Sequence, residues 1–355
     1  MWNSSSSLLT SVLPRPKLRV GSRGVPRTPP ARIVVAGRFP NPTFDYYLKS
    51  RIEMEKLPLQ LADVRSTRWQ KIAGEGTFLV VCRYASLAML NWLDRHEGQI
   101  SGVALLVDDD IPALVTGSEA SLPYRFFLFR KALVPLPRLS RHLDIIWAST
   151  DTLAGRIGND GTVLPPAPPL EMCMSRQHDR DGHQVKIAYH ATSIHNKEHV
   201  FLRPIVADVL QRCPRAHFEV VADGGAARMW SGMERVRVVK PLAWDEYLRE
   251  TSQTHVDILL VPLLDSLVNR SRSDAKRIDA ARMGAAPIYS ASNAYGRCCV
   301  TEELRIPNTF EDWVHHVLLL INDTASRQTH AAIAKERAIA MSLRAEAGLF
   351  EAGRT

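Results

Sequence analysis

The sequence contains little cysteine and lacks any long apolar run. Five cysteines occur among 355 residues, at positions 82, 173, 213, 298 and 299, and no Cys-x-x-Cys pair is present. An odd count without paired spacing argues against a disulfide framework or a zinc ribbon and favours a reducing compartment. No apolar segment reaches the ~18 residues that a membrane-spanning helix requires. We therefore expect a cytoplasmic protein without a transmembrane helix.

Several ligand-binding motifs are also absent. The first β-rich run, "RIVVAG" (residues 32–37), continues as "RFPNP" and lacks the G-x-G-x-x-G fingerprint, so a dinucleotide cofactor has no support. No H-E-x-x-H or similar metal-ligand spacing occurs, and we predict no metal site. The sequence shows neither internal repeats nor a nucleic-acid-binding signature, so we predict no nucleic-acid partner.

Basic residues outnumber acidic ones. The chain has 45 Lys and Arg residues against 37 Asp and Glu residues, which gives a net charge of +8. This surplus by itself favours anionic partners, such as phosphorylated ligands or acidic lipids, without choosing among them. Residues 1–30 are rich in Ser, Pro and Arg and contain no acidic residue. We predict that they form a disordered basic leader; a transit peptide is the alternative.

The hydrophobic pattern predicts two α/β domains. The length suits about two domains of ~150 residues. Strand-like runs alternate with helical segments, pause at the Pro-rich and polar stretch 165–184, and then resume. Such alternation predicts parallel sheets with helices on both faces, that is, two Rossmann-like doubly wound domains facing a cleft, followed by C-terminal helices. The predicted parts are an N-terminal domain (31–168), a linker (169–184), a C-terminal domain (185–323) and a C-terminal helix (324–355).

The stretch "NRSRSDAKRIDAARMGAAPIYS" (269–290) follows the apolar run "VDILLVPLL". This order predicts a strand, a polar helix and another strand. If the helix begins near Ser271 or Ser273, its free amides and its dipole favour an anion there. Arg272, Lys276 and Asp279 would then share one helix face. The alternative is a solvated helix with a serine cap and a lattice of Asp–Arg pairs.

Residues 261–296 resemble the donor-binding stretch of GT-B glycosyltransferases of the group 1, or family 4, type. The resemblance rests on Pro262, Leu263, Asn269, Arg272, Ser273, Lys276, Asp279, Gly284, Pro287 and Ser290. It implies that Asn269, Arg272 and the helix start bind a nucleotide-sugar donor, with Ser273 and Lys276 on its diphosphate and Asp279 on its ribose or sugar. The usual acidic residue is Glu rather than Asp279, and the first Glu of the family's E-x7-E motif falls at Ser271.

The loop in "IAYHATSIHNKEHV" (187–200) resembles the opening of the family's C-terminal domain, where small residues and a basic residue face the diphosphate. The resemblance implies donor contacts for His195 and Lys197. The glycine that usually follows the strand is replaced by His190 and Ala191. The alternative is a polar loop with incidental histidines.

Three aspartates follow a buried strand in "ALLVDDDIPAL" (104–114). Carboxylates so close together repel one another, which raises a pKa or attracts a cation. By resemblance this segment faces the cleft on the acceptor side, and Asp109 or Asp110 is the candidate catalytic base or acceptor contact. The alternative is a strand-end cap with solvated acids.

The segment "LPYRFFLFRKALVPLPRLSRHL" (122–143) contains five Arg or Lys residues, four aromatic residues and no acidic residue. This interleaving suits an anionic membrane surface or a lipid-phosphate acceptor. The alternative is that Phe126, Phe127 and Phe129 pack into the core.

Together these features predict a glycosyltransferase of glycan or polysaccharide biosynthesis, of the hexosyltransferase type and retaining. Its N-terminal domain would bind a saccharide or lipid-linked acceptor and its C-terminal domain a nucleotide-diphosphate sugar. The donor is a substrate, and we expect neither a cofactor nor a required metal, because Lys276, Arg272 and the helix end would offset the phosphate charge. We place the protein in the cytoplasm, peripheral to the membrane. The alternatives are a non-catalytic GT-B-like protein that binds nucleotide or saccharide, and a sugar-nucleotide epimerase.

Overall fold

A computed structural model describes residues 12–158, 160–174, 184–191, 194–296 and 302–351. Residues 1–11 of the predicted leader, most of the predicted linker and two of the cysteines, Cys298 and Cys299, lie outside the described residues. Contacts divide the chain into two units. Unit 1 comprises Met1–Pro168, Ser271–Ser273 and Leu343–Thr355, and unit 2 comprises Pro169–Arg270 and Asp274–Ser342.

Unit 1 is built on a parallel sheet, which contains six strands within the described residues. The strand order is β2-β1-β3-β4-β5-β6, and every neighbouring pair is parallel. The strands are β1 (Arg32–Gly37), β2 (Leu59–Asp63), β3 (Thr77–Cys82), β4 (Gly102–Val107), β5 (Ile145–Ala148) and β6 (Gly161–Val163). Because β1 lies between β2 and β3, the chain winds outward in both directions from the centre, as in a doubly wound fold.

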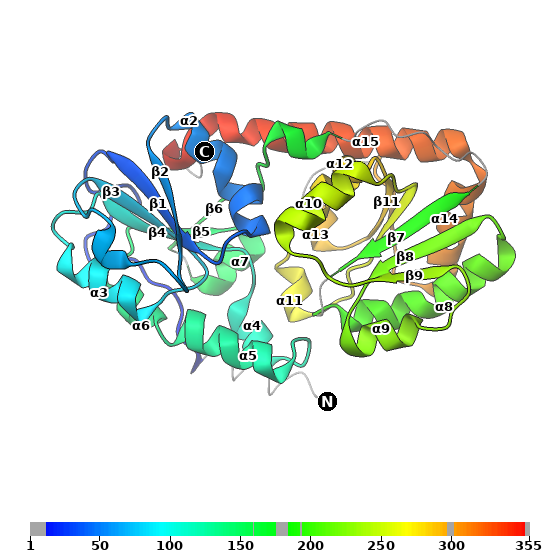
Figure 1. Ribbon diagram of the computed structural model, residues 1–355, viewed down its shortest axis with the longest axis horizontal. Coiled ribbons are helices and arrows are strands. Elements are labelled where there is room, and N and C mark those ends of the chain that lie inside the picture. Colours follow the sequence, from blue (N-terminus) through cyan, green and yellow to red (C-terminus); the bar gives the residue numbers. More distant parts are fainter. Residues whose placement is uncertain (1–11, 159, 175–183, 192–193, 297–301, 352–355) are drawn as a thin grey trace. The chain divides into compact units, whose positions relative to one another are not determined.

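Helices and short helical turns connect these strands, and the last two elements of unit 1 follow α15 near the end of the chain (Figure 1). They are η1 (Phe44–Leu48), α2 (Lys49–Met54), η2 (Trp69–Lys71), α3 (Leu87–Arg95), α4 (Ile111–Thr116), α5 (Leu122–Leu128), η3 (Phe129–Leu133), α6 (Leu136–Leu139), α7 (Asp151–Ile157), η5 (Arg344–Ala347) and α16 (Gly348–Glu351). Ser86 and Thr150 cap α3 and α7 by accepting backbone N–H groups of the first turn. The continuous apolar runs of β3 and β4 are fully buried, as expected for strands covered on both faces.

The part of the predicted leader that the structure describes is hydrogen-bonded to unit 1. The Arg19 amide donates to the Leu143 carbonyl at 2.8 Å, and the Arg27 amide donates to the Ser101 carbonyl at 2.7 Å. The side chains of both arginines pair with Asp144, whose carboxylate is completely buried. This differs from the disordered leader that composition predicts. The reason is that a buried carboxylate requires cations, and its cations come from more than 100 residues away in the chain.

Unit 2 contains a second parallel sheet, again with six strands among the described residues, in the order β12-β11-β10-β7-β8-β9. The strands are β7 (Val185–His190), β8 (Ala216–Val221), β9 (Val236–Val239), β10 (Ile258–Val261), β11 (Ala286–Ser290) and β12 (Arg305–Ile306). The helices are η4 (Leu170–Cys173), α8 (Asn196–Arg212), α9 (Gly224–Trp230), α10 (Trp244–Gln253), α11 (Leu267–Arg270), α12 (Lys276–Met283), α13 (Asn293–Gly296), α14 (Phe310–Asn322) and α15 (Thr324–Leu343).

The two faces of the second sheet differ in polarity. Alternate residues of β7, β8 and β9 point into a large apolar core with α8, α9 and α14, which includes Trp230 and Trp313. The opposite face has a smaller apolar cluster under α12, with Ala280, Met283 and Tyr289. Toward β8 and β9 this second face carries charged and imidazole side chains, and these side chains build the site described next.

Candidate functional site

Helix α12 begins later than the sequence pattern predicts. It starts at Lys276, preceded by Ala275, whose side chain cannot cap it. Arg272 and Ser273 precede the helix, so Arg272 does not share a helical face with Lys276 and Asp279. Residues 271–273 connect α11 to α12, and buried Arg277 pairs with Asp274 and Glu303 at the start of α12. This ion-pair network uses an acid from another segment, and the local pattern did not contain that information.

Lys276 and Asp279 form an ion pair on α12. The Lys276 Nζ lies 2.8 Å from Asp279 Oδ2, and Arg282 donates to Asp279 Oδ1 at 2.5 Å. The Asp279 carboxylate is buried, whereas the Lys276 side chain is 37% exposed. Burial disfavours the charged form of Lys276. The attraction of the Asp279 carboxylate exceeds this effect and raises the pKa of the ammonium. Lys276 is therefore a charged group held in place at the first turn of a helix, where an anion is favoured.

Glu219 anchors a second cluster, on the polar face of the sheet. It lies opposite Ala188 in the register of β7 and β8. Lys186 Nζ lies 3.0 Å from Glu219 Oε2, and His190 Nε2 lies 3.2 Å from Glu219 Oε1. Arg237 Nη1, on β9, lies 3.4 Å from Glu219 Oε2. Burial opposes ionisation of Glu219, but these hydrogen bonds and charges lower the pKa of the carboxyl to about 2.

His190 connects the Glu219 cluster to α10 and α12. Its Nδ1 lies 3.3 Å from the Tyr247 hydroxyl, and Arg282 Cζ lies 5.6 Å from the centre of the Tyr247 ring. Burial lowers the pKa of His190, only partly opposed by Glu219, and both Lys276 and Asp279 act on the same imidazole. His190, Glu219 and Tyr247 line a small pocket of about 40 Å³ beneath α10.

Sequence reasoning missed Lys186, Glu219, Arg237 and Tyr247, and treated His190 only as a replaced glycine. A signal was present. Polar residues fall on one face of β7 and β8, at Lys186 and His190 on β7 and at His217 and Glu219 on β8, within runs that are otherwise apolar. A strand covered on both faces is normally apolar throughout, so this alternation marks a polar face.

Asn269 and His195 meet through Glu198 on α8. The Asn269 Nδ2 donates to Glu198 Oε1 at 2.7 Å and to the Leu264 carbonyl at 2.8 Å. His195 Nδ1 lies 3.6 Å from the other carboxylate oxygen, Oε2 of Glu198. Although burial opposes it, the neighbouring His195 helps to lower the pKa of Glu198. The structure thus brings together two of the predicted donor residues, around an acid that sequence analysis did not identify. Lys197, next to Glu198, is exposed.

The three aspartates after β4 are each paired with arginine in unit 1. Arg83 pairs with Asp108 and, at 3.1 Å, with Asp109. Asp109 also lies 2.8 Å from Arg272, one of the three residues that group with unit 1. The arginines remove the mutual repulsion that the sequence alone suggests. The neighbouring Ser273 hydroxyl lies 2.5 Å from that of Tyr47.

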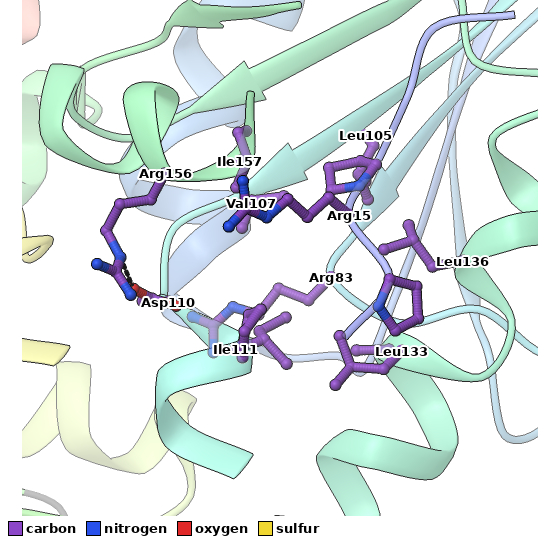
Figure 2. Close-up of a pocket in the computed structure, with 14 residues that line it drawn as sticks. Arg15, Arg83, Leu105, Val107, Asp110, Ile111, Leu133, Leu136, Arg156 and Ile157 are labelled. Atoms are coloured by element: carbon purple, nitrogen blue, oxygen red, sulfur yellow. Dashed lines mark hydrogen bonds and ion pairs between the residues drawn. The ribbon is translucent and has the colours of Figure 1, made fainter. Parts of the chain in front are cut away.

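Asp110 has the geometry of a helix cap. Its Oδ1 accepts the Ala113 amide of α4 at 3.0 Å, and its Oδ2 pairs with Arg156. Figure 2 shows this pair at the edge of a pocket whose apolar wall includes Val107, Ile111 and Leu133. The cap contact is the structural role that the sequence left open for this carboxylate.

The comparisons concern the whole chain. No family model matches the sequence, and no curated protein matches it. The structure is similar to a UDP-forming α,α-trehalose-phosphate synthase from Burkholderia vietnamiensis, with a TM-score of 0.54 and 9% identity over 88% of this chain and 96% of that one. It is also similar to the trehalose-6-phosphate synthase OtsA, with a TM-score of 0.51 and 11% identity over 79% and 71% of the two chains. It is similar as well to a protein from Listeria monocytogenes described as a UDP-N-acetylglucosamine 2-epimerase. The TM-score is 0.50, and the identity is 11% over 87% of this chain and 95% of that one.

The chain has the GT-B fold. Its two Rossmann-like units each carry a parallel sheet, which confirms the predicted α/β class. Identities of 11% or less show the fold and no more, because sites that differ in function occur on the same fold. In such sheets ligands bind beyond the carboxyl ends of the strands, and His190 is the last residue of β7.

The segment 122–143 leaves large apolar side chains exposed on this GT-B fold. Phe126 is 64% exposed, and Leu122, Phe129 and Val134 are also exposed. Phe127 instead packs against Tyr84, with ring centres 5.2 Å apart. The structure therefore places Phe126 and Phe129 outside the core, contrary to the core-packing alternative.

No helix in the described part of the chain is long and apolar enough to cross a membrane. Across the same residues, no group of three or more His, Cys, Asp or Glu side chains could hold a metal ion.

Proposed function

We propose that the protein is a glycosyltransferase that takes a sugar from a nucleotide-diphosphate donor bound on unit 2. The observation that carries this proposal is the partly exposed Lys276 side chain, whose ammonium is held by buried Asp279 at the start of α12. A diphosphate needs localised positive charge, and a paired lysine at a helix N-terminus supplies it without first having to be ordered. The fold supports the proposal, since two of the similar structures are trehalose-phosphate synthases, one of them UDP-forming.

The further donor contacts that we propose are His195, Lys197, Asn269, Arg272 and Ser273. Lys276 would bind the diphosphate, and Asp279 would face the ribose or the sugar. Both Asp279 oxygens already accept from cations, so a donor hydroxyl would have to share this carboxylate with Lys276 and Arg282. No metal is required in this proposal, because Lys276 and the α12 amides offset the phosphate charge.

For the acceptor we propose a saccharide or a lipid-linked saccharide bound on unit 1. The two candidate carboxylates are Asp109, which pairs with Arg83 and Arg272, and Asp110, which caps α4 and pairs with Arg156. We propose transfer of a hexose with retention of its anomeric configuration. The reaction would serve glycan or polysaccharide synthesis.

Binding of nucleotides tests the donor site directly. We would measure the affinity of UDP, GDP, ADP and their glucose or mannose conjugates by calorimetry, for the wild type, Lys276→Ala and the control Lys71→Ala. Lys71 is an exposed lysine of unit 1. We expect nucleotides of one base to bind, and their affinity to fall at least tenfold in Lys276→Ala but not in Lys71→Ala. Equal affinity in all three proteins, or no binding by a folded wild type, would contradict the proposal.

The alternatives give different products from the same donor. A sugar-nucleotide epimerase, as one similar structure is described, would convert the donor to its epimer with no acceptor present. A non-catalytic protein would bind the nucleotide and leave both sugar and nucleotide unchanged. Nuclear magnetic resonance of the donor, with and without a mixture of saccharide acceptors, distinguishes these outcomes.

We also propose that segment 122–143 binds an anionic membrane surface from the cytoplasm. Exposed Phe126 and Phe129 would enter the lipid interface, while basic residues of this acid-free segment other than Arg138, which pairs with Asp94, would attract lipid phosphates. Co-sedimentation with phosphatidylserine vesicles should be strong for the wild type and for the control Phe310→Ser, which alters an exposed Phe of unit 2. It should be lost in Phe126→Ser/Phe129→Ser and with phosphatidylcholine vesicles. Retention by the double variant would exclude this surface.

A further inference from the structure

A series of polar and cation–ring contacts runs from β8 to Lys276, whose side chain is partly exposed. It begins at Glu219, which is opposite Ala188 and is flanked on the same face of β7 by Lys186 and His190. Because Ala188 has only a methyl group, space remains above it for the Glu219 carboxylate to reach both neighbours. The first part of the chain of contacts is therefore set by the strand register.

The direction of each hydrogen bond follows from the charge of Glu219. An ionised carboxylate only accepts, so His190 Nε2 must carry the proton that bonds to Glu219 Oε1. In a neutral imidazole the other nitrogen then accepts, and the Tyr247 hydroxyl must donate to Nδ1. A protonated imidazole would have a hydrogen on both nitrogens, and its Nδ1 could no longer accept a hydrogen bond from Tyr247.

The contacts continue from Tyr247 into α12. The Arg282 guanidinium lies over the Tyr247 ring, with Cζ 5.6 Å from the ring centre, and Arg282 Nε donates to the Thr251 hydroxyl of the same helix, α10, at 2.9 Å. Arg282 in turn donates to Asp279 Oδ1, while Asp279 Oδ2 holds Lys276. Glu219, His190, Arg282 and Asp279 are all buried, and Lys276 is the exposed end.

We infer that His190 and Tyr247 are positioning residues, which set the direction of the Lys276 ammonium toward the diphosphate of a nucleotide sugar. The inference rests on the proposed donor site. Neither residue has to touch the donor. The Tyr247 ring, with the Thr251 hydroxyl, holds the Arg282 guanidinium, which pairs with Asp279 and thereby holds Lys276. A glycine at position 190 could not make these contacts.

A pH profile separates positioning from simple charge. The groups that face His190 are Glu219 from β8, Tyr247 from α10, and Lys276 and Asp279 from α12, with Lys186 on its own strand. If His190 acted only through its charge, protonation would strengthen the binding of an anion. If it positions Lys276, protonation reverses the bond to Tyr247 and weakens binding. A nucleotide sugar is the suitable probe, because its diphosphate is a diester without an ionisation in this range.

The variants exploit the hydrogen-bonding capacity of each side chain. His190→Gln retains one donor and one acceptor but cannot titrate, whereas His190→Leu has neither. Tyr247→Phe removes a single hydroxyl, and Tyr46→Phe is the matched control in unit 1. We would use calorimetry between pH 5.0 and 8.0 with UDP-glucose, GDP-mannose or ADP-glucose, whichever stabilises the wild type most.

We expect Tyr247→Phe and His190→Leu to weaken binding roughly threefold to tenfold at pH 7.5, with unchanged affinity in Tyr46→Phe. The wild type should lose affinity as the pH falls below 6.5, and His190→Gln should bind at pH 7.5 and show a flatter profile. The inference would be overturned if Tyr247→Phe and His190→Leu both bound the nucleotide sugar as tightly as the wild type while Lys276→Ala bound it weakly. The proposed donor site would then stand. A wild type that binds none of the probes would instead overturn the proposed function.

Discussion

Glu219 accepts a hydrogen bond from His190 at 3.2 Å, and both side chains are buried on a sheet face that is normally apolar. A charged acid beside a neutral histidine is costly to bury unless each polar atom has a partner. Lys186 and Arg237 supply further partners for the acid, and Tyr247 supplies one for the imidazole. The second unit thus carries a structured polar network beneath α10.

Removing the charge of Glu219 should destabilise the protein. Glu219→Gln leaves Lys186 and Arg237 without their anion and offers His190 a neutral acceptor. We expect a loss of about 1–3 kcal/mol of unfolding free energy at pH 7, measured by urea denaturation. The exposed acid Glu302, which pairs with Arg337, provides the control Glu302→Gln, which should change stability by less than about 1 kcal/mol. Equal effects of the two substitutions would contradict the role given to Glu219.

His199 should make the fold sensitive to mild acid. Trp230 Nε1 donates to His199 Nδ1 at 3.0 Å, and burial lowers the pKa of the imidazole to about 4. The unfolded chain takes up its proton near pH 6.5, so the unfolded state binds more protons between pH 6.5 and about 4. Stability should therefore fall as the pH drops through this window, by up to roughly 3 kcal/mol.

The His199→Gln variant tests the acid sensitivity. Glutamine can still accept from Trp230 but does not titrate. We would compare urea unfolding of the two proteins at pH 7 and pH 5. The wild type should lose more stability than the variant between these values. An identical loss would assign the acid sensitivity to other groups.

The buried pairs of Arg277 should hold the start of α12 together. Arg277 is almost completely buried and pairs with Asp274 and Glu303. Arg277→Met should cost about 3–5 kcal/mol, because it leaves two buried carboxylates without a cation. The control Arg337→Met removes an exposed partner of Glu302 and should cost less than about 1 kcal/mol. Denaturation midpoints give the difference, and a small effect of Arg277→Met would show that the carboxylates find other partners.

Asp144 should tether the N-terminal segment. Arg19 and Arg27 both pair with this buried carboxylate, and backbone hydrogen bonds join the same segment to Ser101 and Leu143. Asp144→Asn weakens both ion pairs, so trypsin should cut within residues 15–27 faster than in the wild type. The matched control is Asp265→Asn, whose arginine pair is exposed. Unchanged cleavage would mean that the backbone bonds alone hold the segment.

Much of the fold follows from local pattern. The nearly continuous apolar runs of β3, β4 and β10 are typical of strands covered on both faces, because such strands are apolar over most of their length. The end of α12 could also be predicted from the sequence. Gly284 adopts a left-handed conformation with φ 66°, which glycine allows without strain at a helix C-terminus.

Local sequence pattern does not predict most ion-pair partners of the charged residues. The spacing of Lys276 and Asp279 on α12 predicts their proximity, and the structure pairs them. Nothing in the sequence indicates that Asp110 meets Arg156, because 46 residues separate them. Ion pairs across a fold depend on which elements the packing brings together, whereas helix spacing concerns only near neighbours.

The sequence by itself determined the α/β class, the two parallel sheets and the basic start of α12. These depend on hydrophobic periodicity and on helix ends, which are properties of short segments. Only the tertiary structure decided that α12 begins at Lys276, that His190 meets Glu219 and Tyr247, and that Phe126 is exposed. These depend on strand register and helix placement, which join residues far apart in the chain through packing that no local pattern encodes.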